Sequence, residues 1–376
     1  MKILAVFGTR PEAIKMCPLV KKLQKEKTME CCVCLTGQHT DMLAQVMQVF
    51  HVKEDYNLRI MKKGQTLTEV TINILSRLEE VVVKEKPELI LVHGDTSTAF
   101  AGALAGFYLG IPVGHVEAGL RTYNMQAPFP EEFNRQAVDL ITELYFAPTE
   151  EAKENLLNEG KKAEKIFVTG NTVIDALRTT VRENYENEYL NWANGSRLIL
   201  FTAHRRENIG APMRRMFRAL QRVVQDFPDV KVLYPIHKNP AVREIAEEVL
   251  GGAKSIRMIE PLDVIDFHNF IAKSYLVLTD SGGVQEEAPS MGKPVLVMRE
   301  TTERPEGVKA GTIKLVGTGE ETIYQGVKRL LEDKEVYQNM SKAVNPYGDG
   351  YASERIITAI KQHRKDLNIY SSSAMS

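Results

Sequence analysis

The chain has 376 residues, of which 43% are hydrophobic and 26% charged, as in ordinary globular proteins. Lys and Arg together number 48 and Asp and Glu number 49, so the balance gives no electrostatic case for binding bulk nucleic acid or an anionic membrane. A chain of this length suits two domains better than one.

The N-terminal stretch 1–7 is apolar like the start of a signal peptide, but Gly8 follows too soon and no small-residue cleavage site comes after it. We interpret it as a first buried strand. No apolar run is long enough to span a bilayer. Of the four cysteines, three crowd the stretch 31–34, and no second cluster exists to complete a metal site. We expect buried thiols in a cytoplasmic protein.

The first half of the chain alternates short apolar runs with amphipathic stretches, which predicts a parallel, doubly wound sheet. The expected strands are 3–7, 31–35, 89–93, 113–117, 144–147 and 166–168. The expected helices are 13–25, 67–84, 97–109 and 131–141.

The pattern restarts after a polar, charged segment, 182–196, which is one candidate hinge, the other lying near Gly170. The expected strands are 198–202, 230–235, 255–259, 276–279 and 295–297. The expected helices are 212–226, 241–250, 264–273, 284–291 and 322–332. We therefore predict two Rossmann-like doubly wound domains, 1–171 and 172–352, that face a central cleft, and a last helix at about 353–370 that packs back on the first domain.

Ligands of such sheets bind at the C-terminal ends of the strands, so the loops there are the candidate sites. The first loop runs from Gly8 into a helix that starts near Pro11. A helix N-terminus offers free N–H groups to an anion, and Arg10 and Lys15 could add charge near a phosphate. The alternative is a plain turn with solvated basic side chains.

Three carboxylates also follow predicted strands or start predicted helices. Asp95 lies between a buried strand and a helix, where it could instead be a helix cap. Glu117 ends an apolar strand, where poor solvation would raise its pKa and suit it to proton transfer, although a salt bridge to Arg121 is an equal alternative. Glu131 lies in the first turn of a helix, where complementing the helix dipole would also explain it.

The second half has its own anion-binding signals. His204 and two arginines, Arg205 and Arg206, follow a strand and could form an anion site with a titratable member, or a basic surface loop. His237 follows the next strand and could equally be a turn histidine.

The sharpest signal is the stretch from Thr279 to Glu287, in which a strand leads through Ser281, Gly282 and Gly283 into a helix. Such a turn is typical of phosphate binding, because the backbone can approach closely where no Cβ is present. Glu287 could then accept hydrogen bonds from ribose hydroxyls, and Arg304 could reach the same site from the next strand.

Taken together, these segments resemble the non-hydrolysing UDP-N-acetylglucosamine 2-epimerases of bacteria. The matching stretches are 7–15, 92–96, 113–122, 202–208 and 278–298, in family order over nearly the whole chain. The resemblance implies a GT-B-like pair of domains, a homodimer and no cofactor. It also implies reversible inversion at C2 of UDP-GlcNAc, giving UDP-ManNAc for cell-surface polysaccharide, by elimination of UDP to 2-acetamidoglucal and its re-addition.

The resemblance also assigns residues to roles. It implies four catalytic residues: Asp95, Glu117, Glu131 and His204. It implies that UDP is bound by Arg10, Lys15, Phe267, Ser281, Gly282, Gly283, Glu287 and Arg304, with Phe267 in a loop that covers the uracil. Leu262 stands where some members have Gln, which leaves a side-chain contact to the base in doubt.

Several members also bind a second UDP-GlcNAc as an activator, and Gln38, Arg206 and His237 match that site. Asp41 and Gly64 depart from it, because some members have Gln and Arg there. Three alternatives to the epimerase remain: a GT-B glycosyltransferase that uses the same donor, a hydrolysing epimerase, and a catalytically inactive nucleotide-sugar sensor.

Overall fold

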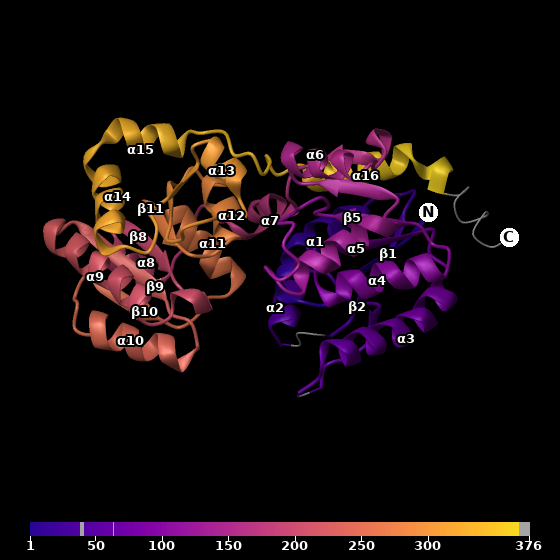
Figure 1. The fold of residues 1–376 in the computed structure, drawn as a ribbon, viewed down its shortest axis with the longest axis horizontal. Helices are drawn as coiled ribbons and strands as arrows, with labels where there is room; N and C mark the ends of the chain where they lie inside the picture. The colour runs from indigo at the N-terminus through magenta and orange to yellow at the C-terminus, as the bar shows by residue number, and fades with distance from the viewer. Residues whose placement is uncertain (38–40, 63, 368–376) are drawn as a thin grey trace. The chain divides into compact units, whose positions relative to one another are not determined.

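The computed structural model describes residues 1–37, 41–62 and 64–367, and it divides the chain into two compact units (Figure 1). Unit 1 comprises Met1–Thr179 and Tyr347–Ser376, and unit 2 comprises Thr180–Pro346. The first division therefore falls after Thr179 rather than after residue 171, and the chain returns to unit 1 at Tyr347, earlier than the boundary expected at 352.

Unit 1 is built on a parallel sheet with the strand order β3-β2-β1-β4-β5-β6-β7. The strands are β1 (Lys2–Phe7), β2 (Glu30–Leu35), β3 (Tyr56–Asn57), β4 (Leu89–His93), β5 (Val113–Val116), β6 (Leu144–Ala147) and β7 (Ile166–Val168). The strand order places β1 beside β4, with Ile3 opposite Leu89, and β4 beside β5, with Ile90 opposite Val113. The central strands are buried on both faces, which explains why they are continuous apolar runs.

Helices cover both faces of this sheet, and α3, α4 and α5 contact one another in series on one side. The helices of unit 1 are α1 (Arg10–Leu23), α2 (Asp41–Val49), α3 (Leu67–Glu85), α4 (Ser97–Tyr108), α5 (Glu131–Ile141), α6 (Glu150–Asn158), η1 (Ala163–Lys165), α7 (Thr172–Thr180) and α16 (Ala352–Gln362). Gly102 and Gly106 let α4 lie close to the sheet, since a Cβ there would meet Val92 and Val113 at 3.1 and 2.9 Å.

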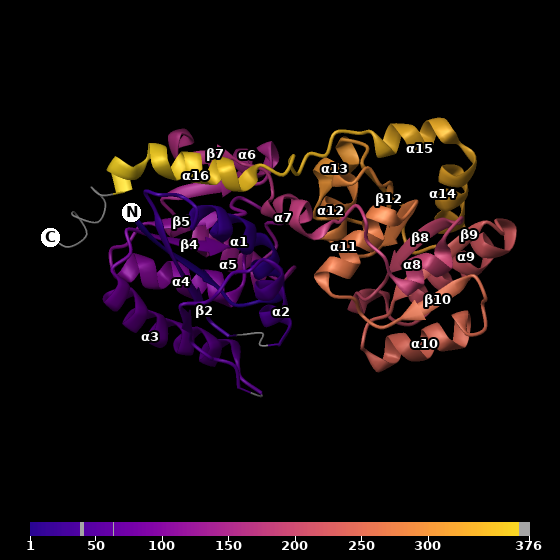
Figure 2. The ribbon, with the colours of Figure 1, turned by 180° about the vertical axis from the view of Figure 1, so that it is seen from behind.

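The last helix, α16, packs on α1, as Figure 2 shows in yellow. Its first turn is capped by the buried Asp175, whose carboxylate accepts the N–H groups of Ala352 and Ser353 at 3.1 and 2.8 Å. Near its other end, Lys361 bonds Glu26 at 2.6 Å. The C-terminal helix is thus an integral part of unit 1.

Unit 2 is a second parallel sheet, with the strand order β10-β9-β8-β11-β12-β13. Its strands are β8 (Arg197–Thr202), β9 (Val230–Pro235), β10 (Ile256–Ile259), β11 (Leu276–Thr279), β12 (Val295–Val297) and β13 (Ile313–Leu315). Its helices are α8 (Glu188–Ala193), η2 (Arg206–Asn208), α9 (Ala211–Asp226), α10 (Pro240–Leu250), α11 (Val264–Lys273), α12 (Val284–Ser290), α13 (Pro305–Lys309), α14 (Glu320–Glu332) and α15 (Lys334–Ser341).

The polar segment 182–196 belongs to unit 2 rather than forming the hinge. It contains the short helix α8, and Tyr185, Tyr189 and Trp192 pack against the core of unit 2. The ring of Trp192 also lies beneath Lys231 and Arg257, 4.8 and 4.5 Å from its centroid. A helix this short gives little apolar periodicity, so the segment looks like a linker in the sequence. In the structure, its aromatic side chains anchor it to unit 2.

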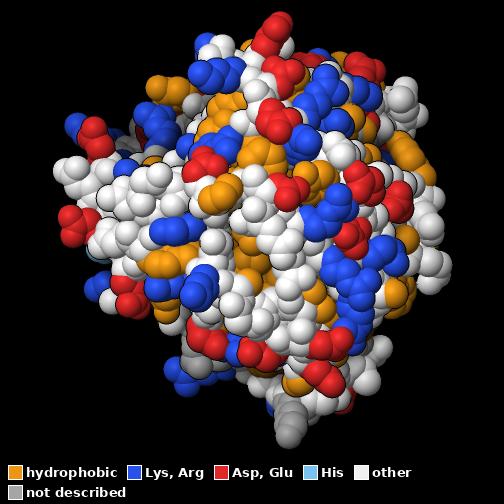
Figure 3. Space-filling view, turned by 90° about the vertical axis from the view of Figure 1, so that its left-hand side faces the viewer, with side chains coloured by type: hydrophobic (Ala, Val, Ile, Leu, Met, Phe, Trp, Pro, Cys, Tyr) orange, Lys and Arg blue, Asp and Glu red, His pale blue; other side chains and the backbone are white. Residues whose placement is uncertain are grey.

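The surface carries both signs of charge. On the face in Figure 3, Lys and Arg side chains are interspersed with Asp and Glu, as the near-zero net charge predicts. Within the described ranges, no helix combines the length and the apolar character needed to cross a membrane.

Candidate active site

Unit 1 has a candidate site where β4 and β5 end. Glu117 leaves β5 in a left-handed backbone conformation, with φ 70°, and its carboxylate is nearly buried. Its Oε1 accepts hydrogen bonds from the Lys15 ammonium and, at 2.9 Å, from Asn171. The alternative of a salt bridge between Glu117 and Arg121 is wrong.

Arg121 instead lies in a separate ion-pair chain, 2.8 Å from Asp139 and 2.7 Å from Glu159. Proximity in sequence suggested Arg121 as the partner of Glu117. In the sheet, only β4 separates β5 from β1, and α1 follows β1. The loop after β5 therefore lies near α1, and Glu117 forms its salt bridge with Lys15 of that helix.

A histidine that sequence reasoning missed completes the surroundings of Glu117. His93 ends β4, is buried, and has its Nε2 3.7 Å from Oε2 of Glu117. That nitrogen has no hydrogen-bond partner among the described residues. Burial lowers the pKa of His93 to about 3, with the nearby Lys15 adding to the effect, so the ring is neutral at physiological pH. Its position directly before Gly94 and Asp95 was the available signal.

Asp95 follows in the same loop and pairs with Arg135, whose Nη2 lies 2.7 Å from its carboxylate. Asn134 donates to the backbone carbonyl of Asp95 at 2.9 Å. The alternative role as a helix cap is wrong, because Thr96 caps α4 by accepting the N–H of Ala99 at 3.0 Å. Burial raises the pKa of Asp95, Arg135 opposes that shift, and the charges of Glu117 and Glu131 add to it. The three predicted carboxylates are thus in electrostatic contact.

Glu131 and Glu132, the two acids in the first turn of α5, differ in their contacts. Glu132 is buried and accepts the N–H groups of Thr122 and Tyr123 at 3.0 and 2.9 Å, which holds the preceding loop. Glu131 is half-buried and makes no hydrogen bond or ion pair with the part of the chain that the structure describes. The structural role therefore falls on Glu132, and the side chain of Glu131 is uncommitted.

The first loop differs from the anion site that was expected. Thr9 caps α1 by accepting the N–H of Glu12, and the buried Glu12 carboxylate accepts the N–H groups of Gly8 and Thr9 at 2.9 and 2.7 Å. The N–H groups of Gly8 and Thr9 are therefore not open to an external anion, because a side chain of the protein already accepts from them. Arg10 is half-exposed at the first position of the helix.

Unit 2 has a candidate site of its own, which a buried aspartate organises. Asp280 accepts the N–H groups of His204 and Arg205 at 3.0 Å each and the amide of Asn208 at 3.0 Å. Its Oδ1 lies 3.1 Å from Nδ1 of His204. Burial alone would raise the pKa of Asp280, but the hydrogen bonds and the charge of His204 outweigh it and lower the pKa. Asp280 thus joins the loop after β8 to the end of β11.

The turn after Asp280 retains free donors. Ser281 donates its N–H to the Thr279 hydroxyl at 2.9 Å, whereas the N–H groups of Gly282 and Gly283 bond none of the residues that the structure describes. A Cβ on Gly282 would have Arg205 as its nearest neighbour, at 3.8 Å. Open backbone donors beside His204 and Arg205 suit this turn to a phosphate.

Three further residues assigned to UDP, Glu287, Arg304 and Phe267, lie on or near α12 of unit 2. Glu287 is 3.7 Å from His268 of α11, and Arg304 is paired with the buried Glu286. Phe267 lies within α11 rather than in a loop, half-buried against the core of unit 2. The loop placement expected for Phe267 is wrong.

Of the residues matched to an activator site, His237 stacks on His204, with ring centroids 6.0 Å apart. Partial burial and the neighbouring His204 lower the pKa of His237. Arg206 is exposed in η2. Gln38 lies outside the described residues.

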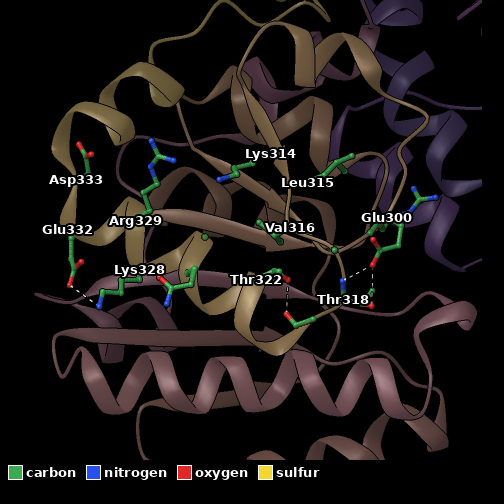
Figure 4. Close-up of a pocket in the computed structure, with 15 residues that line it drawn as sticks. Glu300, Lys314, Leu315, Val316, Thr318, Thr322, Lys328, Arg329, Glu332 and Asp333 are labelled. Atoms are coloured by element: carbon green, nitrogen blue, oxygen red, sulfur yellow. Dashed lines mark hydrogen bonds and ion pairs between the residues drawn. The ribbon is translucent and has the colours of Figure 1, made fainter.

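A groove of about 980 Å³ in unit 2 contains none of the predicted site residues (Figure 4). It runs beside β13 and α14, with Glu300 accepting from the backbone of Thr318 at 3.2 Å on one side and Lys328 lying 3.9 Å from Glu332 on the other. Its walls thus carry both signs of charge, and its volume alone does not favour an anionic ligand.

Comparisons with known proteins agree with this geometry. Two parallel α/β units, one with clustered carboxylates and one with an open phosphate-type turn, define an enzyme of the GT-B-like class. A family described as UDP-N-acetylglucosamine 2-epimerase matches residues 21–361. The chain therefore belongs to the UDP-N-acetylglucosamine 2-epimerase family, which confirms the family, the fold class and the isomerase class predicted from the sequence.

Individual relatives cover nearly the whole chain. The UDP-N-acetylglucosamine 2-epimerase of Bacillus subtilis is 59% identical over 363 residues, covering 96% of each chain. The S. aureus MnaA–UDP structure has a TM-score of 0.89 and 54% identity over 97% of each chain. The Neisseria meningitidis enzyme bound to UDP-GlcNAc has a TM-score of 0.88 and 46% identity, covering 96% of this chain and 100% of that one.

Proposed function

We propose that this enzyme interconverts UDP-GlcNAc and UDP-ManNAc by eliminating UDP and adding it back. In the first step a base removes the C2 proton, the C2–H electrons form the C1=C2 double bond of 2-acetamidoglucal, and the C1–O bond breaks to release UDP. Re-addition after the sugar has turned its other face delivers a proton to C2 and inverts it. The similar Neisseria meningitidis enzyme has a crystal structure bound to UDP-GlcNAc, which supports this substrate.

One observation carries the proposal: the carboxylates of unit 1 differ in their surroundings. Glu117 accepts two hydrogen bonds on Oε1, one from the Lys15 cation, which favours its ionised form, whereas burial raises the pKa of Asp95. Environments that push the pKa values of two carboxyl groups apart are typical of a pair in which one group acts as the base and the other as the acid. We assign proton removal to Glu117 and proton donation to Asp95, with Glu131 as the third catalytic carboxylate.

The loops of unit 2 supply the leaving-group chemistry in this proposal. The N–H groups of Gly282 and Gly283 bind the diphosphate, together with Ser281, Arg304, Arg10 and Lys15, while Glu287 and Phe267 hold the nucleoside. Asp280 orients His204 through Nδ1, which leaves Nε2 to donate to a phosphate oxygen. Donors in place before the C1–O bond breaks stabilise the negative charge that develops on UDP.

Incubation with UDP-GlcNAc in D₂O tests the reaction, with NMR following deuterium at C2 and the formation of UDP-ManNAc. We expect both signals to rise together, and Glu117→Gln and His204→Asn to abolish both. Formation of UDP-ManNAc with hydrogen retained at C2 would overturn proton removal. Accumulation of free UDP in proportion to turnover would instead identify a hydrolysing enzyme.

We further propose that a second UDP-GlcNAc activates the enzyme through Gln38, Arg206 and His237. The stacking of His237 on His204 supports this, because a ligand that touches His237 would also fix the catalytic histidine. Turnover of UDP-ManNAc alone should then show a lag until UDP-GlcNAc accumulates. Steady turnover from the first seconds would contradict activation.

The homodimer implied by the family resemblance has a candidate surface in unit 1. Ile72 of α3, Phe107 and Tyr108 of α4, and Leu140 of α5 are all exposed, and Leu140 is 74% accessible. Because α4 contacts both α3 and α5, these helices form one continuous layer. We propose that a second copy of the chain covers this face.

We also propose that the enzyme is cytoplasmic and that it supplies ManNAc-type sugars for cell-surface polysaccharide.

A further inference from the structure

A buried histidine–aspartate pair contacts the loops that carry Asp95 and Glu117. The side chains of His115 on β5 and Asp139 on α5 are both fully buried. Nδ1 of His115 lies 2.6 Å from Oδ1 of Asp139, and Nε2 lies 2.8 Å from the carbonyl oxygen of Gly94.

Hydrogen-bond chemistry determines the protonation of this pair. A carbonyl oxygen can only accept, so Nε2 of His115 carries a proton. Oδ2 of Asp139 accepts from Arg121 at 2.8 Å and from the N–H of Gly119 at 3.1 Å, while Oδ1 lies 2.6 Å from Nδ1 of His115. Burial alone would raise the pKa of Asp139, but His115 and Arg121 lower it. The donors on Oδ2 favour an ionised Asp139, and an ionised carboxylate oxygen can bond Nδ1 at 2.6 Å only when Nδ1 carries a proton as well.

The surrounding charges balance. The imidazolium of His115 and the guanidinium of Arg121 are matched by Asp139 and by Glu159, which Arg121 contacts with two hydrogen bonds of 2.7 Å. A chain of alternating charges therefore runs from the interior of unit 1 to Glu159, which is partly exposed.

The two backbone groups that this chain holds belong to the two catalytic loops. Gly94 directly precedes Asp95, and Gly119 is two positions beyond Glu117. Glu117, which is not a glycine, has a positive φ of 70°, so its loop adopts a backbone conformation that neighbouring contacts must support. One carboxylate, Asp139, reaches the first loop through His115 and the second loop directly.

We propose that His115 and Asp139 are positioning residues, which form a buried imidazolium–carboxylate pair that sets the placement of Asp95 and Glu117 relative to each other. Neither residue touches the substrate. Their contribution therefore belongs to the proton-transfer step rather than to binding. This inference rests on the proposed catalytic roles of Asp95 and Glu117.

The first test needs no mutation of Asp139. In protein labelled with ¹⁵N-histidine, we expect both ring nitrogens of His115 to have the shifts and attached protons of an imidazolium at about pH 8, where an ordinary histidine is neutral. A His115→Gln variant identifies the resonances among the eight histidines. A neutral ring in the wild-type protein would overturn the proposal.

The second test separates positioning from simple structural support. Asp139→Asn keeps the size of the side chain but removes the counter-charge, so we expect the imidazolium signal to disappear and kcat to fall about 100-fold while KM stays within about threefold. Glu159→Gln is the matched control, since it removes the outermost charge of the same chain, and kcat should stay near the wild-type value.

Folded Asp139→Asn protein that retains its kcat, or loses activity through KM alone, would overturn the positioning role. If Asp139→Asn does not fold, the ring protonation of wild-type His115 still decides the proposal. Failure of the proposed function is distinguishable, because it would appear as retained activity in Glu117→Gln, whatever the state of His115.

Discussion

The ammonium of Lys15 is hydrogen-bonded to the carboxylate of Glu117, although 102 positions separate the two residues in the sequence. Lys15 lies in the second turn of α1, after β1, and Glu117 follows β5, with β4 between these strands in the sheet. The contact places a cation on the carboxylate to which we assign proton removal, and so several experiments depend on it.

Lys15→Met should lower kcat by about 100-fold, because the ionised Glu117 loses its counter-charge, with a smaller effect on UDP affinity. Steady-state kinetics and calorimetric titration with UDP measure the two effects separately. Lys21→Met is the matched control, since Lys21 lies on the same helix and its ammonium donates to the exposed backbone carbonyl of His51 at 3.0 Å. A Lys15→Met variant impaired only in UDP binding would contradict the role given to this ion pair.

His93→Gln should make folding less sensitive to acid. The pKa of His93 is about 3 in the folded protein and 6.5 without perturbation, so the unfolded chain takes up the proton first as pH falls. The stability that depends on neutral His93 is present above about pH 6.5 and is lost by about 1.4 kcal/mol per pH unit on the way down to about pH 3.

Between about pH 7.5 and about pH 5, the wild-type protein should therefore lose about 2 kcal/mol of unfolding free energy more than His93→Gln does. Urea denaturation at both pH values measures the difference. His51→Gln provides the control, because His51 is exposed on the same unit. Parallel losses in wild type and His93→Gln would show that His93 is not held neutral by the fold.

Gly282→Ala should weaken UDP binding by about tenfold or more while leaving the unfolding midpoint nearly unchanged. The added methyl group meets nothing closer than Arg205, at 3.8 Å, so the fold tolerates it, but it occupies the space through which a phosphate reaches the backbone donors. Calorimetry and thermal unfolding measure the two effects.

Gly319→Ala, in the groove of Figure 4, is the matched control for Gly282→Ala. Its nearest neighbour would be the Thr322 hydroxyl at 3.0 Å, the end of a side chain. If UDP affinity fell in Gly319→Ala and not in Gly282→Ala, the nucleotide would belong in the groove instead.

Leu140→Glu should convert a dimer to a monomer of 42.3 kDa, because it places a charge on the exposed apolar layer of α3, α4 and α5. Sedimentation velocity measures the mass. Val344→Glu is the control, since Val344 is 84% exposed but lies in unit 2. A dimer that survives Leu140→Glu and dissociates in Val344→Glu would move the interface to the other unit.

Much of the fold was predictable, since buried parallel strands are apolar runs of characteristic length. The bounds of β4, β6, β9 and α11 are those expected from the sequence. Short elements were predicted only in part, since the three-residue strands β7 and β12 were expected whereas the six-residue helix α8 was not.

The partners of charged side chains were less predictable, because they depend on strand order. Arg121 is near Glu117 in sequence, yet in the folded chain Glu117 pairs with Lys15 and Arg121 pairs with Asp139. The occupied loop before α1 is a different case. Thr9 and Glu12 have the spacing of a capping box, a signal present in the sequence that would have shown the N–H groups to be taken.

The excursion of the chain into unit 2 has a consequence for biosynthesis. Unit 2 is one continuous stretch, whereas unit 1 is completed only by the segment from Tyr347 onward. During translation, α1 is among the first helices made and α16, which covers part of it, is the last. Unit 1 therefore stays incomplete until the segment from Tyr347 onward has been made, while unit 2 has all its residues earlier, and a message truncated before the codon for Tyr347 would leave the carboxylates that we propose as catalytic on an incomplete unit.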